Sequence, residues 1–417
     1  MVPLHRLSSP RRVHPFHAHL GAVGMANLAD GVMQTGIGLL ALTLTRSPSA
    51  MGALSAAVWL PWLLLGLSAG RGVDRWDRRR IMIVALTMRA ILLLAVTGLA
   101  MAGHLTILIL VFLALSYGIT EVFVDLAAQA QVPALTGRSS TELQRANARL
   151  LSLEQITNGF IGPPLAGLLV GLGAAWVLGL PAVAVLAAVL VLFLGLRRWR
   201  APATRSAPED DEKNHLNGGL RILWRHPVLR PLIFFGALWN AGSTAMGAVL
   251  LLWMVGPGSA GALTPQTWGL VVIALPAGAL LGSWLATYLL RRLPEMTVLL
   301  SCWAVGAAAL VVPLISPSVA GMVAYGLIAG IAGVIGNVVS GSIRPRMIPD
   351  AQLGRVGGAA RFVGFGIMPV SALTAGQLAA IVGIPAIMIA AAVTAELATL
   401  LAGATVSQKL INAHELT

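Results

Sequence analysis

Five carboxylates lie inside long apolar runs of this sequence, where a charge is costly to bury. They are Asp30, Glu121, Asp125, Glu154 and Glu396, among fifteen Asp and Glu residues in the whole chain. Because a charged side chain in hydrocarbon costs several kcal/mol, such residues usually face a cavity, a partner or a proton pathway. The chemistry to expect is therefore proton uptake and release, or solute binding, inside a membrane.

Glu121 and Asp125 are four residues apart, so they share one face of a helix. In a low-dielectric site, two neighbouring carboxylates favour the protonated form of one of them, as a proton carrier requires. This spacing makes Glu121 the first proton-coupling candidate, and Glu154 and Asp30 are the other two. Glu396, in the last apolar run, is expected to serve local packing.

Asp30 lies near the middle of the first run, with Asn27 and Gln34 on the same helical face. At about 1.5 Å per residue, this polar stripe lies near the membrane midplane, a depth at which a membrane protein could hold a solute. Arg89, about 14 Å into its own run, is a further candidate for the same cavity. The alternative interpretation is structural, in which Arg89 forms an ion pair with Asp30 or Glu121.

Aromatic side chains supply the remaining cavity candidates. Trp59, Trp62 and Trp239 lie in apolar runs and could line a cavity for an amphipathic solute. The alternative is that they are interfacial anchors, as expected for most of the eleven tryptophans.

The elements that position these residues are membrane-spanning helices. The chain is 57% hydrophobic and 10% charged, whereas soluble domains carry about 25% charged residues. Since a spanning helix needs about 20 apolar residues, the runs predict twelve helices. Their expected spans are 17–45, 49–70, 80–102, 105–132, 143–170, 174–196, 229–255, 266–290, 296–314, 318–343, 354–380 and 384–404.

Positive charge alternates between the connections of these helices. Most of the 28 Lys and Arg residues precede the first helix or lie in the connections at 71–80, 138–149, 197–230, 291–292 and 344–361. The intervening connections carry none, with Arg46 as the exception. Positive charge in short loops stays in the cytoplasm, so both termini are expected there, in a multi-pass protein of the bacterial inner membrane.

Composition and motifs exclude several other classes of protein. The net charge of +13 is accounted for by cytoplasmic loops, and no basic stripe interleaved with aromatics suggests nucleic acid. The single Cys302 excludes an intramolecular disulfide or a cysteine metal cluster. Neither lysine, Lys213 or Lys409, lies in a phosphate-binding loop, so we expect no ATPase, no other enzyme, no cofactor and no metal.

The chain divides into two six-helix halves. Residues 1–196 form the first half, 197–228 a cytoplasmic linker along the membrane surface, and 229–417 the second half. The segment from Pro133 to Arg138 has a weak echo in the segment from Pro349 to Arg355, half a chain later. Paired halves with a solute site between them are typical of secondary transporters. The predicted fold is therefore an all-α membrane protein of twelve transmembrane helices in two pseudo-symmetric halves.

The connection between the second and third helices carries a recognisable motif. Residues 70–80, Gly-Arg-Gly-Val-Asp-Arg-Trp-Asp-Arg-Arg-Arg, resemble the signature loop of the major facilitator superfamily. The residues that match are Gly70, Asp74, Arg75, Arg78 and Arg79. Asp77 stands at the second glycine of the motif, where we expect Asp to tolerate left-handed geometry. The resemblance implies a cytoplasmic gate latch, in which Asp125 pairs with the arginines of the loop.

A second, partial motif lies in the fifth helix. Residues 162–167, Gly-Pro-Pro-Leu-Ala-Gly, resemble the motif of drug antiporters, with Gly159, Gly162, Pro163 and Gly167 as its candidate positions. Ala166 replaces one glycine of that motif. Small residues allow close helix approach and proline bends the helix.

These resemblances imply a transporter similar to the branch that contains enterobactin exporters and macrolide efflux proteins. The expected function is export of a small amphipathic molecule, antibiotic-, siderophore- or peptide-like, by proton antiport and alternating access. The protein is expected to act as a monomer in the lipid bilayer. The alternatives are a proton-coupled importer of a small solute and, more distantly, a solute sensor that does not transport.

Overall fold

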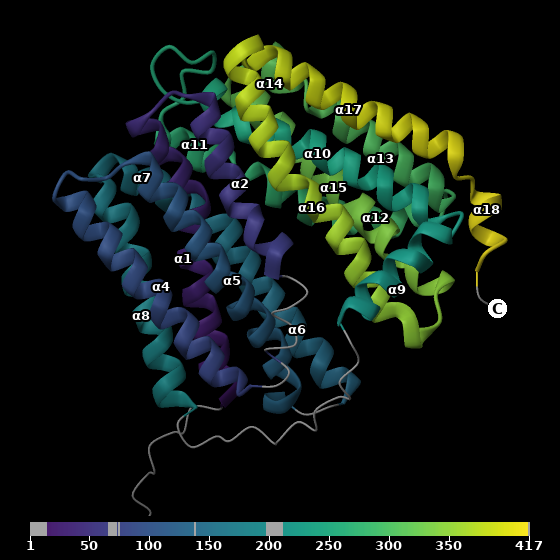
Figure 1. Cartoon of the computed structure of the whole chain (residues 1–417), viewed down its shortest axis with the longest axis horizontal. Helices are drawn as coiled ribbons and strands as arrows, with labels where there is room; N and C mark the ends of the chain where they lie inside the picture. Colours follow the sequence, from purple (N-terminus) through teal and green to yellow (C-terminus); the bar gives the residue numbers. More distant parts are fainter. Residues whose placement is uncertain (1–14, 66–72, 74–75, 137–138, 197–211, 416–417) are drawn as a thin grey trace, which may run out of the picture.

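The computed structural model describes residues 15–65, 73, 76–136, 139–196 and 212–415, and this part of the chain is almost entirely helical (Figure 1). The first half contains α1 (Pro15–Leu44), α2 (Pro48–Leu65), α4 (Arg78–Met101), α5 (Ile107–Thr136), α6 (Ser140–Glu154), the π-helix η1 (Gln155–Ile161), α7 (Gly162–Leu172) and α8 (Ala174–Gly195). The second half contains α9 (Glu212–Arg225), α10 (Leu229–Met254), α11 (Pro265–Val271), α12 (Ala274–Leu290), α13 (Glu295–Ala309), α14 (Val312–Ile315), α15 (Val319–Met347), α16 (Asp350–Val382), α17 (Ile384–Thr405) and α18 (Gln408–Asn412).

Ten spans in the described residues are long and apolar enough to cross a membrane, counting α11 with α12 and α13 with α14 as one span each. The 30-residue α1 and the continuous unit α6–η1–α7 are the other two members of the twelve-helix fold. The protein is therefore a multi-pass membrane protein.

The two halves use the same turn at equivalent places. Gly173, between α7 and α8, has φ 116°, and Gly383, between α16 and α17, has φ 87°. Both values lie in the region that favours glycine, so a single residue reverses the chain at each site. The helix pairs are equivalent too, because α1 packs on α8 as α10 packs on α17.

Three of the helices expected to be continuous are broken, each next to a proline. The span 143–170 divides into α6, η1 and α7, directly before Pro163 and Pro164. Because these prolines lack an N–H, the carbonyls of residues 159 and 160 lose their α-helical donors, and a π-turn accommodates the gap. The spans 266–290 and 296–314 break before Pro276 and Pro313 for the same reason.

The segment expected to be a surface linker, 197–228, contains the helix α9 within its described part. Leu223 of α9 is buried with Ala359 and Ala360 of α16, so α9 packs on the second half. At Gly219 an added Cβ would lie 2.3 Å from the Arg355 carbonyl oxygen, which shows how closely the two helices approach. This part of the segment is therefore a helix docked on the second half.

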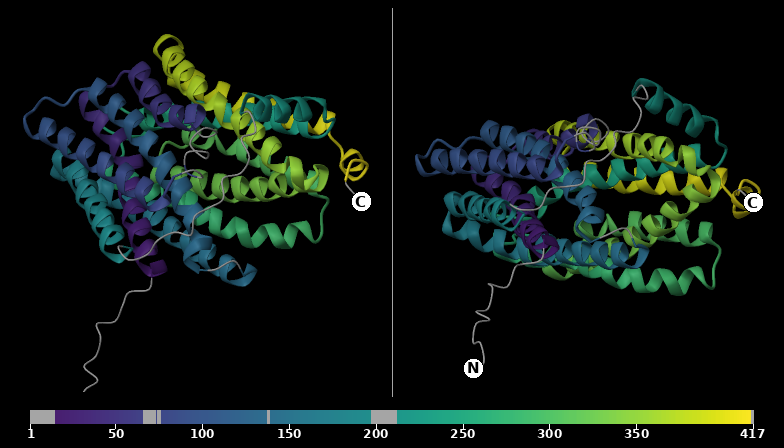
Figure 2. Two further views of the ribbon diagram at one scale, coloured as in Figure 1. Left: turned by 60° about the horizontal axis from the view of Figure 1, so that its bottom comes forward. Right: turned by 90° about the horizontal axis from the view of Figure 1, so that it is seen from below.

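The halves meet at one end of the molecule, which we call the joined end. There α2 packs on α16, and α7 packs on α11. In Figure 1 this end is at the top, and the halves diverge toward the bottom, with α6 and α9 on opposite sides. Figure 2 shows the same division from two other directions, with first-half helices in purple to teal and second-half helices in teal through green to yellow.

Candidate functional site

The centre of the first half is organised by a close crossing of α1 with the broken helix. An added Cβ at Gly31 would lie 2.5 Å from the Asn158 carbonyl oxygen, and one at Gly162 would lie 2.5 Å from the Gly31 Cα. Two backbones therefore touch without side chains between them. Asp30, the neighbour of Gly31, is held by this crossing in the interior of the half, where it is 3% exposed.

Asp30 forms an ion pair with Arg89 of α4. The Arg89 Nη1 lies 2.6 Å from Asp30 Oδ1, and the Tyr117 hydroxyl of α5 donates to the same oxygen at 2.6 Å. The Arg89 Nε donates to Thr120 Oγ1 at 3.0 Å. The guanidinium also lies 4.2 Å from the centre of the Tyr117 ring. We call these four residues the buried ion-pair cluster, and it ties three helices together.

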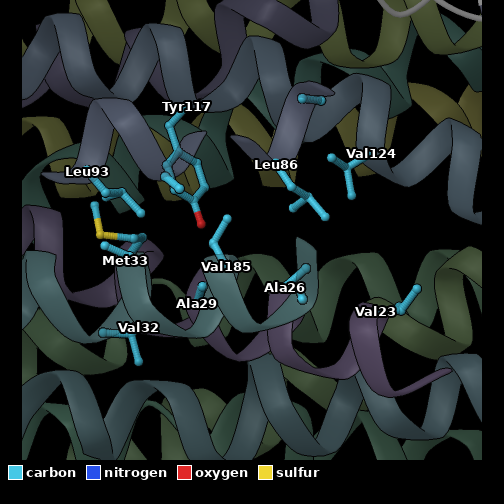
Figure 3. Close-up of a cluster of buried hydrophobic side chains, with 14 of the residues drawn as sticks. Val23, Ala26, Ala29, Val32, Met33, Leu86, Leu93, Tyr117, Val124 and Val185 are labelled. Atoms are coloured by element: carbon cyan, nitrogen blue, oxygen red, sulfur yellow. The ribbon is translucent and has the colours of Figure 1, made fainter. Parts of the chain in front are cut away.

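The surroundings of this cluster are apolar. Figure 3 shows the Tyr117 ring among buried side chains that include Met33 of α1, Leu93 of α4 and Val185 of α8. Arg89 is fully buried, and its Nη2 has no hydrogen-bond partner among the described residues. A buried cation in such surroundings depends on its counterion, because desolvation of the guanidinium must be offset by the carboxylate.

Three further carboxylates act electrostatically on this pair. Glu121 and Asp125 lie on α5, are half-buried, and act electrostatically on the Arg89 guanidinium. Glu154 lies at the end of α6, is exposed, and feels the charge of Asp30. The structure thus links the three proton-coupling candidates electrostatically, because Glu121 acts on Arg89 and Glu154 acts on Asp30, with Asp125 as a fourth acid.

The predicted substrate-cavity residues of α1 and α4 require a correction. Asn27, Asp30 and Arg89 are buried, and the Asn27 side chain donates to the Val23 carbonyl oxygen within its own helix. These residues lie inside the wall of the first half and do not line an open surface. Of the polar stripe on α1, Gln34 alone is exposed. The geometry agrees with the alternative, structural interpretation, in which Arg89 forms an ion pair with Asp30.

The tryptophans are not gathered at one site. Trp59 and Trp62 are half-buried on α2. Trp239 lies on α10 in the other half, where its Nε1 donates to the Trp303 carbonyl oxygen at 3.2 Å. There it lines a cavity of about 260 Å³ with residues of α13, α15 and α16.

The signature loop is described in part, since Gly70, Asp74 and Arg75 lie outside the described residues. Arg78 belongs to the first turn of α4, and Arg79 extends to α8, where its Nη2 donates to the Phe193 carbonyl oxygen at 3.1 Å.

The expectation that Asp77 adopts left-handed geometry is wrong. Its φ of −64° and ψ of 110° are extended, and its side chain accepts from the N–H groups of Arg79 and Arg80. It is therefore the N-cap of α4, which is a different reason for Asp to replace glycine at this position.

The antiporter-like motif lies where the halves meet. An added Cβ at Gly167 would lie 2.5 Å from the Pro265 carbonyl oxygen of the other half, and one at Gly159 would lie 3.3 Å from Pro276. The Pro163 carbonyl oxygen approaches Gly269 of α11 equally closely. With Gly162 against α1, the motif residues contact both halves through their small size.

Two members of the ion-pair cluster were not predicted. Tyr117 lies one turn before Glu121, and Thr120 lies directly before it. Because Tyr and Thr are common in apolar helices, their residue types alone do not indicate a functional site. Their spacing of three residues, on the face of α5 that turns toward Arg89, is the signal that could have identified them.

Comparison with known proteins identifies the family of the chain. The sequence profile of the Major Facilitator Superfamily matches residues 20–293. The chain is 26% identical to the multidrug efflux pump Tap of Mycolicibacterium fortuitum over 364 residues, which are 84% of this chain and 86% of that protein. It is also 26% identical to Tap of Mycobacterium tuberculosis (strain ATCC 25618 / H37Rv), over 89% of both chains.

Solved structures share the fold at lower identity. The structure of a bacterial homolog of the human lysosomal transporter Spinster matches with a TM-score of 0.70 at 15% identity, over 98% of this chain and 99% of that one. The nucleoside transporter NupG matches with a TM-score of 0.72 at 13% identity, over 94% of this chain and all of that one. The chain belongs to the major facilitator superfamily and is a membrane transporter.

Proposed function

We propose that this transporter exports small amphipathic molecules in exchange for protons. The observation that carries the proposal is the excess of carboxylates over cations around Arg89 in the interior of the first half. Arg89 is paired with Asp30 at 2.6 Å, and the described residues provide no such cation for Glu121 or Asp125. Neighbouring acids in a low-dielectric site favour the protonated form of one of them, so Glu121 is the proposed proton carrier.

The direction of transport follows from the likeness to Tap and from the charge pattern. Tap is named a multidrug efflux pump, and this chain matches 86% of the Mycolicibacterium protein. We assign the connections rich in arginine, both termini and the diverging end of the molecule to the cytoplasm of a bacterial cell. The joined end is then periplasmic, and the structure represents the state that takes up solute from the cytoplasm.

Closing the cytoplasmic end is the proposed role of the signature loop. Arg79 fixes the start of α4 to α8, and Asp125 on α5 has no ion-pair partner among the described residues. Asp125 is therefore available to pair with an arginine of the loop when the two halves, 1–196 and 229–417, rock against each other. Asp74→Asn is expected to reduce transport without changing the amount of folded protein in the membrane.

The test of proton coupling uses inverted membrane vesicles with an imposed proton gradient and a fluorescent amphipathic dye. Wild-type protein should accumulate the dye inside the vesicles. Glu121→Gln should abolish accumulation and retain downhill exchange, because an amide cannot carry the proton. Glu154→Gln is the second candidate, and Glu396→Gln on α17 is the matched control that should behave as wild type.

The outcomes separate the alternatives. Gradient-driven accumulation only in right-side-out vesicles would indicate an importer. If both glutamine variants still concentrate the dye with unchanged pH dependence, the proton is carried elsewhere and this assignment is refuted.

A further inference from the structure

The second half contains a cavity of about 260 Å³ between α10, α13, α15 and α16. One face of α15 supplies its polar lining, because Asn337, Ser340 and Arg344 recur at helical spacing along that face. Arg361 of α16 completes the lining on the opposite side. No Asp or Glu is among the described residues that line this cavity.

The two arginines of this cavity have no counterion among the described residues, in contrast to their neighbour Arg346. The Nε of Arg344 is buried without a hydrogen-bond partner among the described residues, and the positive charge of Arg361 acts on it. Arg346, two residues further along α15, pairs with Glu295 and with Glu415. The chain thus neutralises the arginine outside the cavity and leaves the two inside it available for an anion.

Aromatic rings form the remaining walls. The ring of Trp303 packs beside Gly236 and Gly336, and Trp239 is fixed by its hydrogen bond to the Trp303 carbonyl oxygen. Phe365, which is 43% exposed, also lines the cavity. Flat apolar rings next to guanidinium groups fit an aromatic body that carries an acidic group.

We propose that this cavity binds an aromatic carboxylate, as a subsite for the acidic end of the transported molecule. The inference rests on the proposed function for its place in transport, and its binding chemistry stands independently. Arg344 and Arg361 bind the carboxylate, Asn337 and Ser340 add donors, and Trp303 and Phe365 contact the ring. Since ligand pockets are typically about 300–1,000 Å³, this one holds a single ring system and not a whole drug.

The substrate class follows from the two halves together. The first half has carboxylates that are half-buried or exposed, at Glu121, Asp125 and Glu154, whereas the described lining of this cavity has arginines and no carboxylate. A molecule with an acidic group on an aromatic body is attracted by the second half and repelled by the acids of the first. Aromatic acids should therefore be recognised in preference to neutral or cationic aromatics of the same shape.

The experiment is isothermal titration calorimetry on the full-length protein in phosphatidylcholine nanodiscs, which carry no net negative charge. The probes are 1-naphthoate, its neutral amide and 1-naphthylmethylammonium. Wild-type protein should bind the naphthoate at least tenfold more tightly than either other probe, since hydrogen bonds to charged groups are worth about a tenfold effect or more. Added phosphatidylglycerol that competes with the naphthoate would instead identify a lipid phosphate as the occupant.

Variants assign the effect to the cavity. Arg344→Gln and Arg361→Gln should each weaken naphthoate binding about tenfold and leave amide binding unchanged. Arg344→Lys should recover part of the loss, because it keeps the charge without the planar fork. Arg292→Gln, at an exposed cation outside the cavity, is the matched control. Thermal unfolding of each variant verifies its fold. Because the Arg361 side chain is exposed, Arg361→Gln is the variant least prone to misfold.

Equal binding of the three probes, or equal naphthoate affinity in wild type and in a folded Arg344→Gln or Arg361→Gln variant, would overturn the proposal. Because no proton gradient is present in this measurement, its result is independent of proton antiport. Binding without gradient-driven transport would leave this site standing and refute the proposed coupling.

Discussion

Replacing Asp30 by Asn should destabilise the protein more than replacing Arg89 by Met, because a carboxylate can lose its charge and a guanidinium cannot. Removing one partner of a buried ion pair costs about 3–5 kcal/mol. Asp30→Asn leaves a fully buried cation with the Tyr117 ring and Thr120 as its neighbours, and a cation–π contact returns only about 2 kcal/mol. The expected loss is at the upper end, about 5 kcal/mol.

Arg89→Met leaves a carboxylate that can take up a proton and keep its hydrogen bond with Tyr117. Neutralising an ordinary carboxyl group at pH 7 costs at most about 4 kcal/mol, so the expected loss is about 3 kcal/mol. The double substitution removes both charges, and it should lie within about 2 kcal/mol of wild type.

The measurement is thermal unfolding of purified protein in nanodiscs, followed as the fraction that remains monodisperse. The unfolding temperature should be highest for the wild type and should decrease in the order double variant, Arg89→Met and Asp30→Asn. Thr120→Val, which removes one hydrogen bond to Arg89, should have a smaller effect than either charge substitution. A wild-type melting curve for Asp30→Asn, or additive losses in the double variant, would refute this account of the buried pair.

Substitutions at three other positions test separate contacts. Asp77→Ala should lower stability by about 1 kcal/mol through loss of the α4 cap, and Asp77→Gly by less, in thermal melts. Burial, and then the His414 ring, lower the pKa of His226. The folded protein therefore favours the neutral imidazole, and the contribution of His226 to the free energy of unfolding is complete above its ordinary pKa of about 6.5 and decreases as the pH falls below that value. His226→Asn should remove this pH dependence of stability. Gly376→Ala places a Cβ 2.6 Å from the Pro48 carbonyl oxygen, so α2 and α16 should separate at the joined end. A cysteine introduced beside Pro48 should then react faster with a membrane-impermeant maleimide in this variant than in the wild-type background.

The helices could be predicted from the sequence because hydrophobic runs have to match the membrane. The breaks could not, because prolines act differently from one helix to another. Pro61 and Pro181 lie inside continuous α-helices, whereas Pro163 follows a π-turn. The difference at Pro163 is its surroundings, since η1 packs against α1 and approaches Pro276 of the other half. Sequence alone does not place those neighbours.

Arg46 illustrates the same limit for charge. The alternation of charged connections makes it an exception, and composition offers no reason for it. In the structure, its Nη1 donates to the Val255 carbonyl oxygen at 2.6 Å, across the joined end. A structural contact between halves therefore accounts for a cation that topology alone does not explain.

The candidate sites differ in how far the sequence could predict them. Asp30 and Arg89 could be paired in advance, because two opposite charges in apolar runs need partners. The cavity of the second half could not be predicted from the sequence, because residues of four helices form it. Its arginines lie near helix ends, where positive charge is ordinary. Only the contrast between Arg344 and the paired Arg346 distinguishes it.

The contacts of this transporter divide into those that hold during transport and those that break. Inside the first half, Asp30 and Arg89 form a buried pair whose separation would strand two charges, so α1, α4 and α5 should move as one unit. Between the halves, α2 meets α16 at Gly52 and Gly376, and dispersion contacts of this kind are individually weak. Separating such surfaces leaves no charge unpaired, and the Arg46 hydrogen bond can be replaced by water at the membrane surface. Rigid halves that no ion pair joins among the described residues are therefore suited to alternating access.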